Sequence, residues 1–260
     1  MPRFAVNLSL LFTDVPLLRR FERAARAGFR SVEFMFPYGE DVDGIERELK
    51  RLGLELILFN LPAGDFAAGE RGLANHPARR GEFRDGVAKS IEIARRLRVP
   101  RVNGLVGVRL RDVPEAEQHA CLVDNLRHAA TELEKAGLRF QVEPLNDTDT
   151  PGFYLTTSRQ AFRLMDDVGH PNIALQYDVY HMQIMEGNLT TTIINNLQRI
   201  PHIQIADVPG RHQPGTGEIN FPFLLRRLDE IGYQGYVSLE YRPEGTPEES
   251  FGWLKEMGFW

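Results

Sequence analysis

IALQYD at residues 173–178 is a short apolar run that ends on a carboxylate, and similar runs recur in the second half of the chain. The others are LRFQVE at 138–143, HIQ at 202–204 and GYVSLE at 235–240. Successive runs are separated by enough residues for a helix and two loops, which a parallel strand pair requires. The four runs therefore predict parallel strands whose polar last residues meet at one end of a sheet.

The same alternation extends back to the N-terminus. Apolar and β-branched runs alternate with amphipathic segments whose apolar residues recur at three- and four-residue spacing. The eight expected strands are 3–9, 31–36, 54–60, 101–106, 138–143, 172–177, 201–206 and 235–240. Asp14, Ser158 and Thr190 are expected to start helices. Eight strands and eight helices in 260 residues predict an α/β chain folded as a (β/α)8 TIM barrel, with one domain spanning residues 1–260.

A doubly wound open sheet is the competing architecture. No Gly-rich dinucleotide-binding fingerprint follows the first expected strand, which an open sheet of the Rossmann type would carry. Residues from four consecutive late strands would also converge only at the mouth of a closed barrel. The barrel is therefore favoured.

Composition excludes several classes of protein. The net charge of −5 argues against a general nucleic-acid-binding surface. No apolar stretch approaches the roughly 20 residues needed to cross a bilayer, and the N-terminus resembles a first strand more than a signal peptide. Cys121 is the single cysteine, so no internal disulfide is possible, and its place in a helical pattern predicts a small buried apolar residue. We expect a cytoplasmic protein.

The polar residues that close the four runs predict a metal site. They are three carboxylates and one amide: Glu143, Asp178, Gln204 and Glu240. Three carboxylates at one barrel mouth would repel one another unless a cation neutralised them. Oxygen ligands suit Mg²⁺ or Mn²⁺, whereas zinc is less expected because this quartet contains neither Cys nor His.

Such a site suits proton abstraction next to a carbonyl. A cation acidifies the C–H bond beside an α-hydroxy carbonyl, so that one carboxylate can remove the proton and a second can return it to the adjacent carbon. Glu143 and Glu240, the longer carboxylates, are the expected catalytic pair. His181 follows Asp178 closely, within reach of a substrate bound there.

Two loops stand out after strands. Residues 61–80 form a connection long enough to be a substrate-binding loop or lid. It carries Glu70 and Arg71, and Arg71 could hold a substrate carboxylate with two parallel hydrogen bonds. GTGEI at 215–219 either approaches a ligand closely, binds phosphate or forms a tight turn.

Nearly the whole chain resembles the hydroxypyruvate isomerase family of the xylose isomerase-like barrels. The resemblance runs through FERAARAGFRSVEFMFPY, NLPAGDFAAGERG, EFRDGVA, VEPLN, PGFYLT, QYDVYHMQIMEG, HIQIAD, PGTGEIN and LEYRP. It implies that Glu143, Asp178, Gln204 and Glu240 bind a divalent metal and that the two glutamates exchange the substrate proton. Many relatives carry histidine where this chain has Gln204.

The resemblance also implies a reaction. Family members interconvert hydroxypyruvate and 2-hydroxy-3-oxopropanoate (tartronate semialdehyde) through an enediol, and the substrate carboxylate makes Arg71 an expected contact, with Glu70 and His181 beside it. The partner would be a small 2-oxo acid, with neither nucleic acid nor membrane, and a homo-oligomer is left open.

Three alternatives remain open at this stage. The first is an isomerase or epimerase of a four-carbon 2-oxo acid such as 2-oxotetronate, or of a free sugar. The second is a metal-dependent hydrolase or nuclease on the same barrel. The third is a sugar-binding barrel without catalysis, which would have no need of paired glutamates.

Overall fold

The structure is a computed structural model that describes residues 2–260. Its strands form a closed barrel in the order β1 to β8. They are β1 (Arg3–Asn7), β2 (Ser31–Glu33), β3 (Glu55–Asn60), β4 (Arg101–Gly104), β5 (Arg139–Val142), β6 (Ile173–Asp178), β7 (His202–Ile205) and β8 (Tyr236–Leu239). Each predicted strand is present, so the TIM-barrel prediction is confirmed.

Helices follow the strands, as predicted. They are α1 (Leu17–Arg26), α2 (Val42–Leu52), α3 (Arg80–Leu97), α4 (Glu115–Lys135), α5 (Ser158–Val168), α6 (Val179–Met185), α7 (Leu189–Asn195), α8 (Phe221–Glu230) and α9 (Gly252–Glu256). Short 3₁₀ helices cover Pro77–Arg79, Leu197–Arg199 and Glu249–Phe251. The segment between β6 and β7 holds two helices, α6 and α7, where the sequence pattern predicted one. Within residues 2–260, no helix is both long and apolar enough to cross a membrane.

Of the predicted helix starts, Ser158 is confirmed as the first residue of α5, whereas α1 begins at Leu17 instead of Asp14 and α7 begins at Leu189 instead of Thr190. Pro16, not Asp14, precedes α1. Thr157, not Ser158, caps α5, because its side chain accepts a hydrogen bond from the Gln160 N–H in a capping box. Asn188, not Thr190, precedes α7.

The chain packs as two compact units. The first comprises the described residues up to Phe34 together with Asp43–Leu56 and Tyr177–Trp260, and the second comprises Met35–Val42 and Ile57–Gln176. The prediction of one domain over residues 1–260 stays a prediction.

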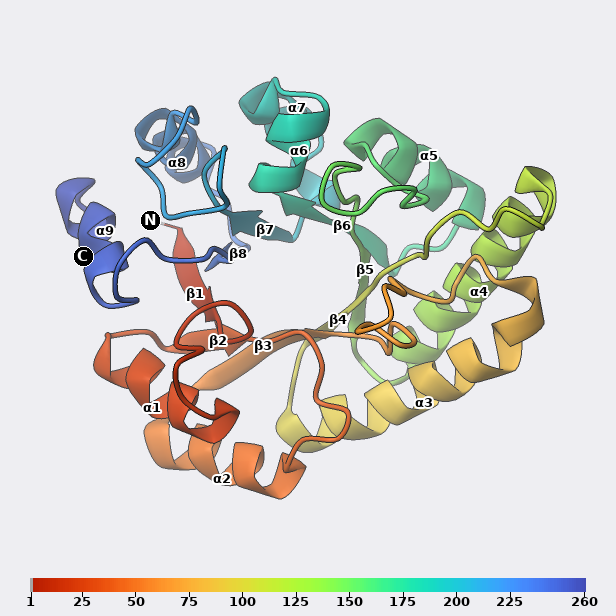
Figure 1. Ribbon diagram of the computed structural model, residues 1–260, viewed down its shortest axis with the longest axis horizontal. Helices are drawn as coiled ribbons and strands as arrows, with labels where there is room; N and C mark the ends of the chain where they lie inside the picture. Colours follow the sequence, from red (N-terminus) through yellow and green to blue (C-terminus); the bar gives the residue numbers. More distant parts are fainter. Residues whose placement is uncertain (1) are drawn as a thin grey trace. The chain divides into compact units, whose positions relative to one another are not determined.

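In the first unit, β1 lies between β2 and β8, and β7 pairs with the other side of β8 (Figure 1). Val6 on β1 is level with Val32 and Leu239, and Ile205 is also level with Leu239. All these pairs are parallel, so the polar residues at the carboxyl ends of these strands share one edge.

In the second unit, β4 lies between β3 and β5. Asn60 is level with Asn103, and Val142 is level with Leu175, so Glu143 and Gln176 follow adjacent paired residues. Helices α3 and α4 run side by side in Figure 1. Cys121 is fully buried in α4, which confirms the prediction that it is a small core residue.

Candidate active site

A buried carboxylate organises the polar end of the first unit. Glu33, at the end of β2, has no exposed surface. Its Oε1 accepts hydrogen bonds from Asn7 Nδ2 at 2.9 Å and from Gln204 Nε2 at 2.7 Å. Its Oε2 lies 2.8 Å from His202 Nε2. Burial alone would raise the pKa of Glu33, but the charge of His202 and the hydrogen bonds from its neighbours outweigh burial and lower it.

Glu240 is tied into the same network. It follows β8 directly and is almost fully buried. Its Oε1 accepts a hydrogen bond from Asn7 Nδ2 at 2.9 Å, and its Oε2 pairs with Arg211 Nη2 at 2.5 Å. Since the Asn7 amide also bonds Glu33, a single side chain connects the two glutamates.

Arg211 joins Glu240 to Asp178. Asp178, the last residue of β6, caps α6 by accepting the Tyr180 N–H at 2.8 Å. Its Oδ2 lies 3.1 Å from Arg211 Nη2 and 3.4 Å from His181 Nε2. Burial raises the pKa of Asp178, although Arg211 opposes the shift. Burial, with a further contribution from Arg211, lowers the pKa of His181 well below its usual value, so the ring is neutral and able to act as a ligand.

In the second unit, Glu143 is held by two amides. It follows β5 and is almost fully buried. Its Oε2 accepts hydrogen bonds from Asn103 Nδ2 and Gln176 Nε2, both at 2.9 Å. Asn103 also donates to Asn60 Oδ1 at 3.1 Å. The carboxylate is therefore oriented by neutral donors.

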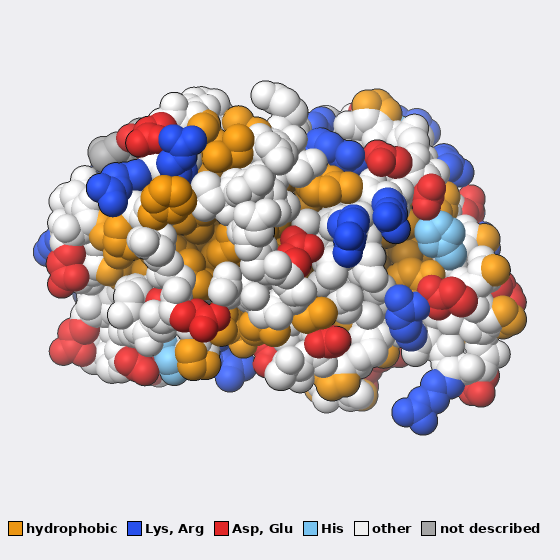
Figure 2. All heavy atoms as spheres, turned by 90° about the horizontal axis from the view of Figure 1, so that it is seen from above, with side chains coloured by type: hydrophobic (Ala, Val, Ile, Leu, Met, Phe, Trp, Pro, Cys, Tyr) orange, Lys and Arg blue, Asp and Glu red, His pale blue; other side chains and the backbone are white. Residues whose placement is uncertain are grey.

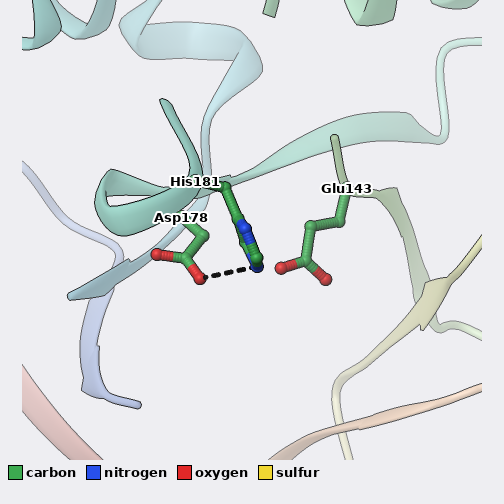
Figure 3. A group of neighbouring side chains, drawn as sticks. All are labelled: Glu143, Asp178 and His181. Carbon is green, nitrogen blue, oxygen red and sulfur yellow. Dashed lines mark ion pairs between the residues drawn. The ribbon is translucent and has the colours of Figure 1, made fainter. Parts of the chain in front are cut away.

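Glu143, Asp178 and His181 form a group of potential metal ligands. One ligand atom of each lies within 4.8 Å of the others, and all three residues are buried. Figure 3 shows the side chains pointing toward one another. Two carboxylates and a neutral imidazole are a chemically suitable donor set for a divalent ion. This group could hold a metal.

The group overlaps with the predicted quartet but differs from it. Glu143 and Asp178 belong to both, while His181, predicted as a substrate contact, lies among the potential ligands. Gln204 turns its amide nitrogen toward Glu33, and Glu240 contacts Asn7 and Arg211. The assignment of Glu143, Asp178, Gln204 and Glu240 as metal ligands stays a prediction.

The other predicted site residues, Glu70 and Arg71, lie on the long loop of the second unit and are held by contacts within that loop. The Glu70 carboxylate accepts the Asp65 N–H and pairs with Arg79, so Glu70 braces the loop. Arg71 Nη1 donates to the carbonyls of Phe66 and Glu70 at 2.9 and 2.8 Å, and its guanidinium stacks 3.8 Å above the centre of the Phe66 ring.

Two further features hold this loop in place. A Cβ at Gly72 would lie 1.9 Å from the Leu105 carbonyl oxygen, and its φ is +111°, so glycine is required there. The Phe66 ring packs against Phe36 with their centres 5.0 Å apart. Arg71 is therefore presented by an ordered loop.

Sequence reasoning missed Arg211. The available signal was a Gly–Arg pair in a loop rich in proline and glycine, immediately after a strand that ends at the predicted site. The long-range pairing of Arg211 with Asp178 and Glu240 is visible only in three dimensions.

Comparison with known proteins gives one family and several full-length relatives. Residues 21–257 match the model of the xylose isomerase-like TIM barrel. The chain is 50% identical over 254 residues to hydroxypyruvate isomerase of Escherichia coli K12, covering 98% of both chains. It is 39% identical to 2-oxo-tetronate isomerase of Cupriavidus necator, again over 98% of both chains. A crystal structure described as AP endonuclease, family 2, from Brucella melitensis superposes with a TM-score of 0.95 at 43% identity, covering 98% of this chain and 99% of that one.

Proposed function

Because this chain belongs to the xylose isomerase-like TIM barrel family, we propose that it interconverts hydroxypyruvate and 2-hydroxy-3-oxopropanoate with the help of a divalent metal ion. The chain is an isomerase of a small 2-oxo acid, as its full-length relatives are. The identity of 50% to hydroxypyruvate isomerase is the observation that carries the choice of substrate.

The proposed reaction moves one proton between neighbouring carbons. A glutamate removes a proton from C3 of hydroxypyruvate, which gives an enediolate across C2 and C3. A glutamate then delivers a proton to C2, while the O3 hydroxyl loses its proton and O2 gains one. The product is an isomer, so no oxidant or reductant is needed. We assign the two proton transfers to Glu143 and Glu240.

The surroundings of the two glutamates support these roles. Glu143 is held by the side-chain amides of Asn103 and Gln176, which orient it without adding charge. Glu240 pairs with Arg211, so a cation faces the carboxylate that is proposed to exchange the proton. In the proposed reaction the Arg211 cation beside Glu240 would stabilise the negative charge of the enediolate.

The proposed ligands for the metal are Glu143, Asp178, Gln204 and Glu240, with His181 as a further donor from the observed group. Carboxylate oxygens favour Mg²⁺ or Mn²⁺, while the imidazole is better suited to later transition metals. When bound, the ion would polarise the carbonyl of the substrate. Neutral His181 would otherwise be placed to donate a hydrogen bond to a substrate oxygen.

The proposed function is tested with the metal-stripped protein. Hydroxypyruvate is added, Mg²⁺, Mn²⁺ or Zn²⁺ is restored separately, and formation of the aldehyde is followed by NMR. We expect turnover with Mg²⁺ or Mn²⁺ and little without metal. A folded protein that converts hydroxypyruvate with none of the three ions would refute the proposed substrate, and full activity after stripping would refute the metal requirement.

Arg71 is proposed to bind the substrate carboxylate. Its Nη1 is engaged by the loop, which leaves the Nε–Nη2 edge for two parallel hydrogen bonds. Hydrogen bonds to charged groups contribute about 1.5–3 kcal/mol, so Arg71→Ala should raise KM for hydroxypyruvate about 10–100-fold with a smaller change in kcat. Arg71→Lys, which keeps the charge but loses the fork, should fall between. Equal KM values in all three proteins would contradict this role.

The alternatives differ in what they would turn over. Substrate profiling with 2-oxotetronate and free sugars separates the four-carbon acid and sugar isomerases, because Arg71→Ala should lower activity only toward carboxylated substrates.

The nuclease class is raised by the description of the Brucella structure. The net charge of −5 opposes binding to DNA, and the face in Figure 2 carries acidic and basic side chains interspersed. Cleavage of an apurinic oligonucleotide by the metal-loaded protein would revive that class.

A cytoplasmic location and a homo-oligomeric state stay proposals beside this function. The buried single cysteine is compatible with a reducing compartment, and sedimentation of the purified protein would determine the number of subunits.

A further inference from the structure

We propose that Asp207 positions Arg211, and that residues 215–219 form a cradle for the Asp207 carboxylate instead of a phosphate site. The role of Arg211 next to the substrate rests on the proposed function. The role of Asp207 in fixing that arginine rests on contacts within the first unit alone.

Main-chain N–H groups saturate the Asp207 carboxylate. Asp207 follows β7 and has no exposed surface. Its Oδ1 accepts from Val208 N at 3.0 Å and Ile219 N at 3.1 Å, and its Oδ2 accepts from Gly215 N and Gly217 N, both at 2.9 Å. A carboxylate has about four acceptor positions, so its capacity is filled by the two ends of one loop.

The close approach explains the glycine in GTGEI. A Cβ on Gly217 would lie 2.1 Å from the Val208 carbonyl oxygen and 2.7 Å from Asp207 Oδ1. A side chain there would push the backbone off the carboxylate. The N–H groups of Gly215 and Gly217 are already bonded to the Asp207 carboxylate, so they do not need a phosphate as their acceptor.

The loop closed in this way carries Arg211 in a fixed conformation. Arg211 has a left-handed backbone with φ of +60°, which is uncommon for a residue with a side chain. Asp207 N donates to the His212 carbonyl at 2.8 Å, and Arg242 N donates to the Arg211 carbonyl at 2.8 Å. The backbone of Arg211 is thereby tied to the ends of both β7 and β8.

Contacts with three residues restrict the position of the Arg211 side chain. Its Nη2 reaches Asp178 and Glu240, and its guanidinium lies 4.9 Å from the centre of the Tyr180 ring. A displacement of about 1 Å of such a group can cost about 100-fold in rate. Loosening the Asp207 cradle should therefore act on the reaction through Arg211.

The test is Asp207→Asn, which keeps the size but places an NH₂ group against two N–H donors. We expect kcat/KM for hydroxypyruvate to fall about 10–100-fold. In an Arg211→Met background the same change should cause almost no further loss, because residues that act through one another are not additive. Asn220→Ala is the matched control: it removes the cap of α8 beside the loop and should leave kcat/KM unchanged.

A second measurement does not depend on turnover. In protein labelled with ¹⁵N-arginine, the Arg211 Nε–H resonance should be sharp and slowly exchanging, and should broaden or disappear in Asp207→Asn and in Gly217→Ala but not in Asn220→Ala. If hydroxypyruvate is not converted at all, the proposed function fails and this resonance alone decides the role of Asp207. An unchanged resonance, additive losses in the double variant, or saturable shifts of the Gly215 and Gly217 amides with inorganic phosphate would overturn the proposal.

Discussion

Glu240→Gln should lower kcat with hydroxypyruvate by about 10²–10⁴-fold, the range typical for loss of a general acid–base group. The amide keeps the size of the side chain and one acceptor oxygen, so Asn7 retains a hydrogen-bond partner. It cannot take up a proton, and it removes one of the two carboxylates with which Arg211 pairs. We therefore expect the loss to fall on kcat far more than on KM.

The measurement combines steady-state kinetics with deuterium incorporation from D₂O. In the unmodified enzyme, deuterium should enter C2 of the aldehyde product and exchange into C3 of hydroxypyruvate. If Glu240 serves only one carbon, Glu240→Gln should abolish exchange at that carbon and leave the other to Glu143, and Glu143→Gln should give the reverse pattern. Glu218→Gln is the control, since this exposed residue bonds Gln183 instead of the network.

A wild-type kcat in Glu240→Gln would exclude Glu240 from proton transfer. It would be incompatible with the paired-glutamate mechanism. If the unmodified protein and both glutamine variants bind the acid normally but none of them converts it, the result would indicate the non-catalytic binding barrel.

The strands of this fold were predictable because a barrel strand is buried on both sides and reads as a continuous apolar run. Residues such as 173–178 carry that signal locally, and the polar residue that ends each run marks the mouth. Helix starts carried a weaker signal. Ser158 and its neighbour Thr157 are equally good caps by composition, and only the reciprocal bond to Gln160 makes Thr157 the cap.

The site was predictable to the extent that its residues end strands. Glu143 and Asp178 do, and they belong to the group of side chains that could hold a metal. Arg211 depends on a loop whose shape is set by a buried carboxylate and four N–H groups, which no periodicity records. His181 was predicted as a substrate contact near Asp178; its place beside Glu143 as well depends on the turn of α6 and could not be predicted from spacing alone.

Glu33→Ala should have the largest effect on stability of any change in this network. Glu33 is fully buried and is the shared partner of His202, Gln204 and Asn7. Removing the carboxylate takes the shared acceptor away from buried polar groups, which costs about 1–3 kcal/mol for each group that loses it. Urea unfolding should show that loss of free energy with an unchanged m-value. Glu55→Ala is the control, because Glu55 is an exposed strand residue that accepts one hydrogen bond from Tyr236, and it should cost less than about 1 kcal/mol.

The same side chain should also govern metal affinity. Glu33 accepts a hydrogen bond from Gln204 Nε2 and so orients the side-chain amide whose Oε1 is proposed to bind the metal. Groups that orient metal ligands typically change affinity by about 10–100-fold when removed. Glu33→Gln separates the effect on stability from the effect on metal affinity, because it retains the shape of the side chain and should unfold less readily than Glu33→Ala. Titration of this variant with Mn²⁺ should still show a lower affinity than the unmodified protein. If Mn²⁺ binds this variant as tightly as the unmodified protein, the Gln204 amide needs no partner to face the metal, and the role of Glu33 is confined to stabilising the fold.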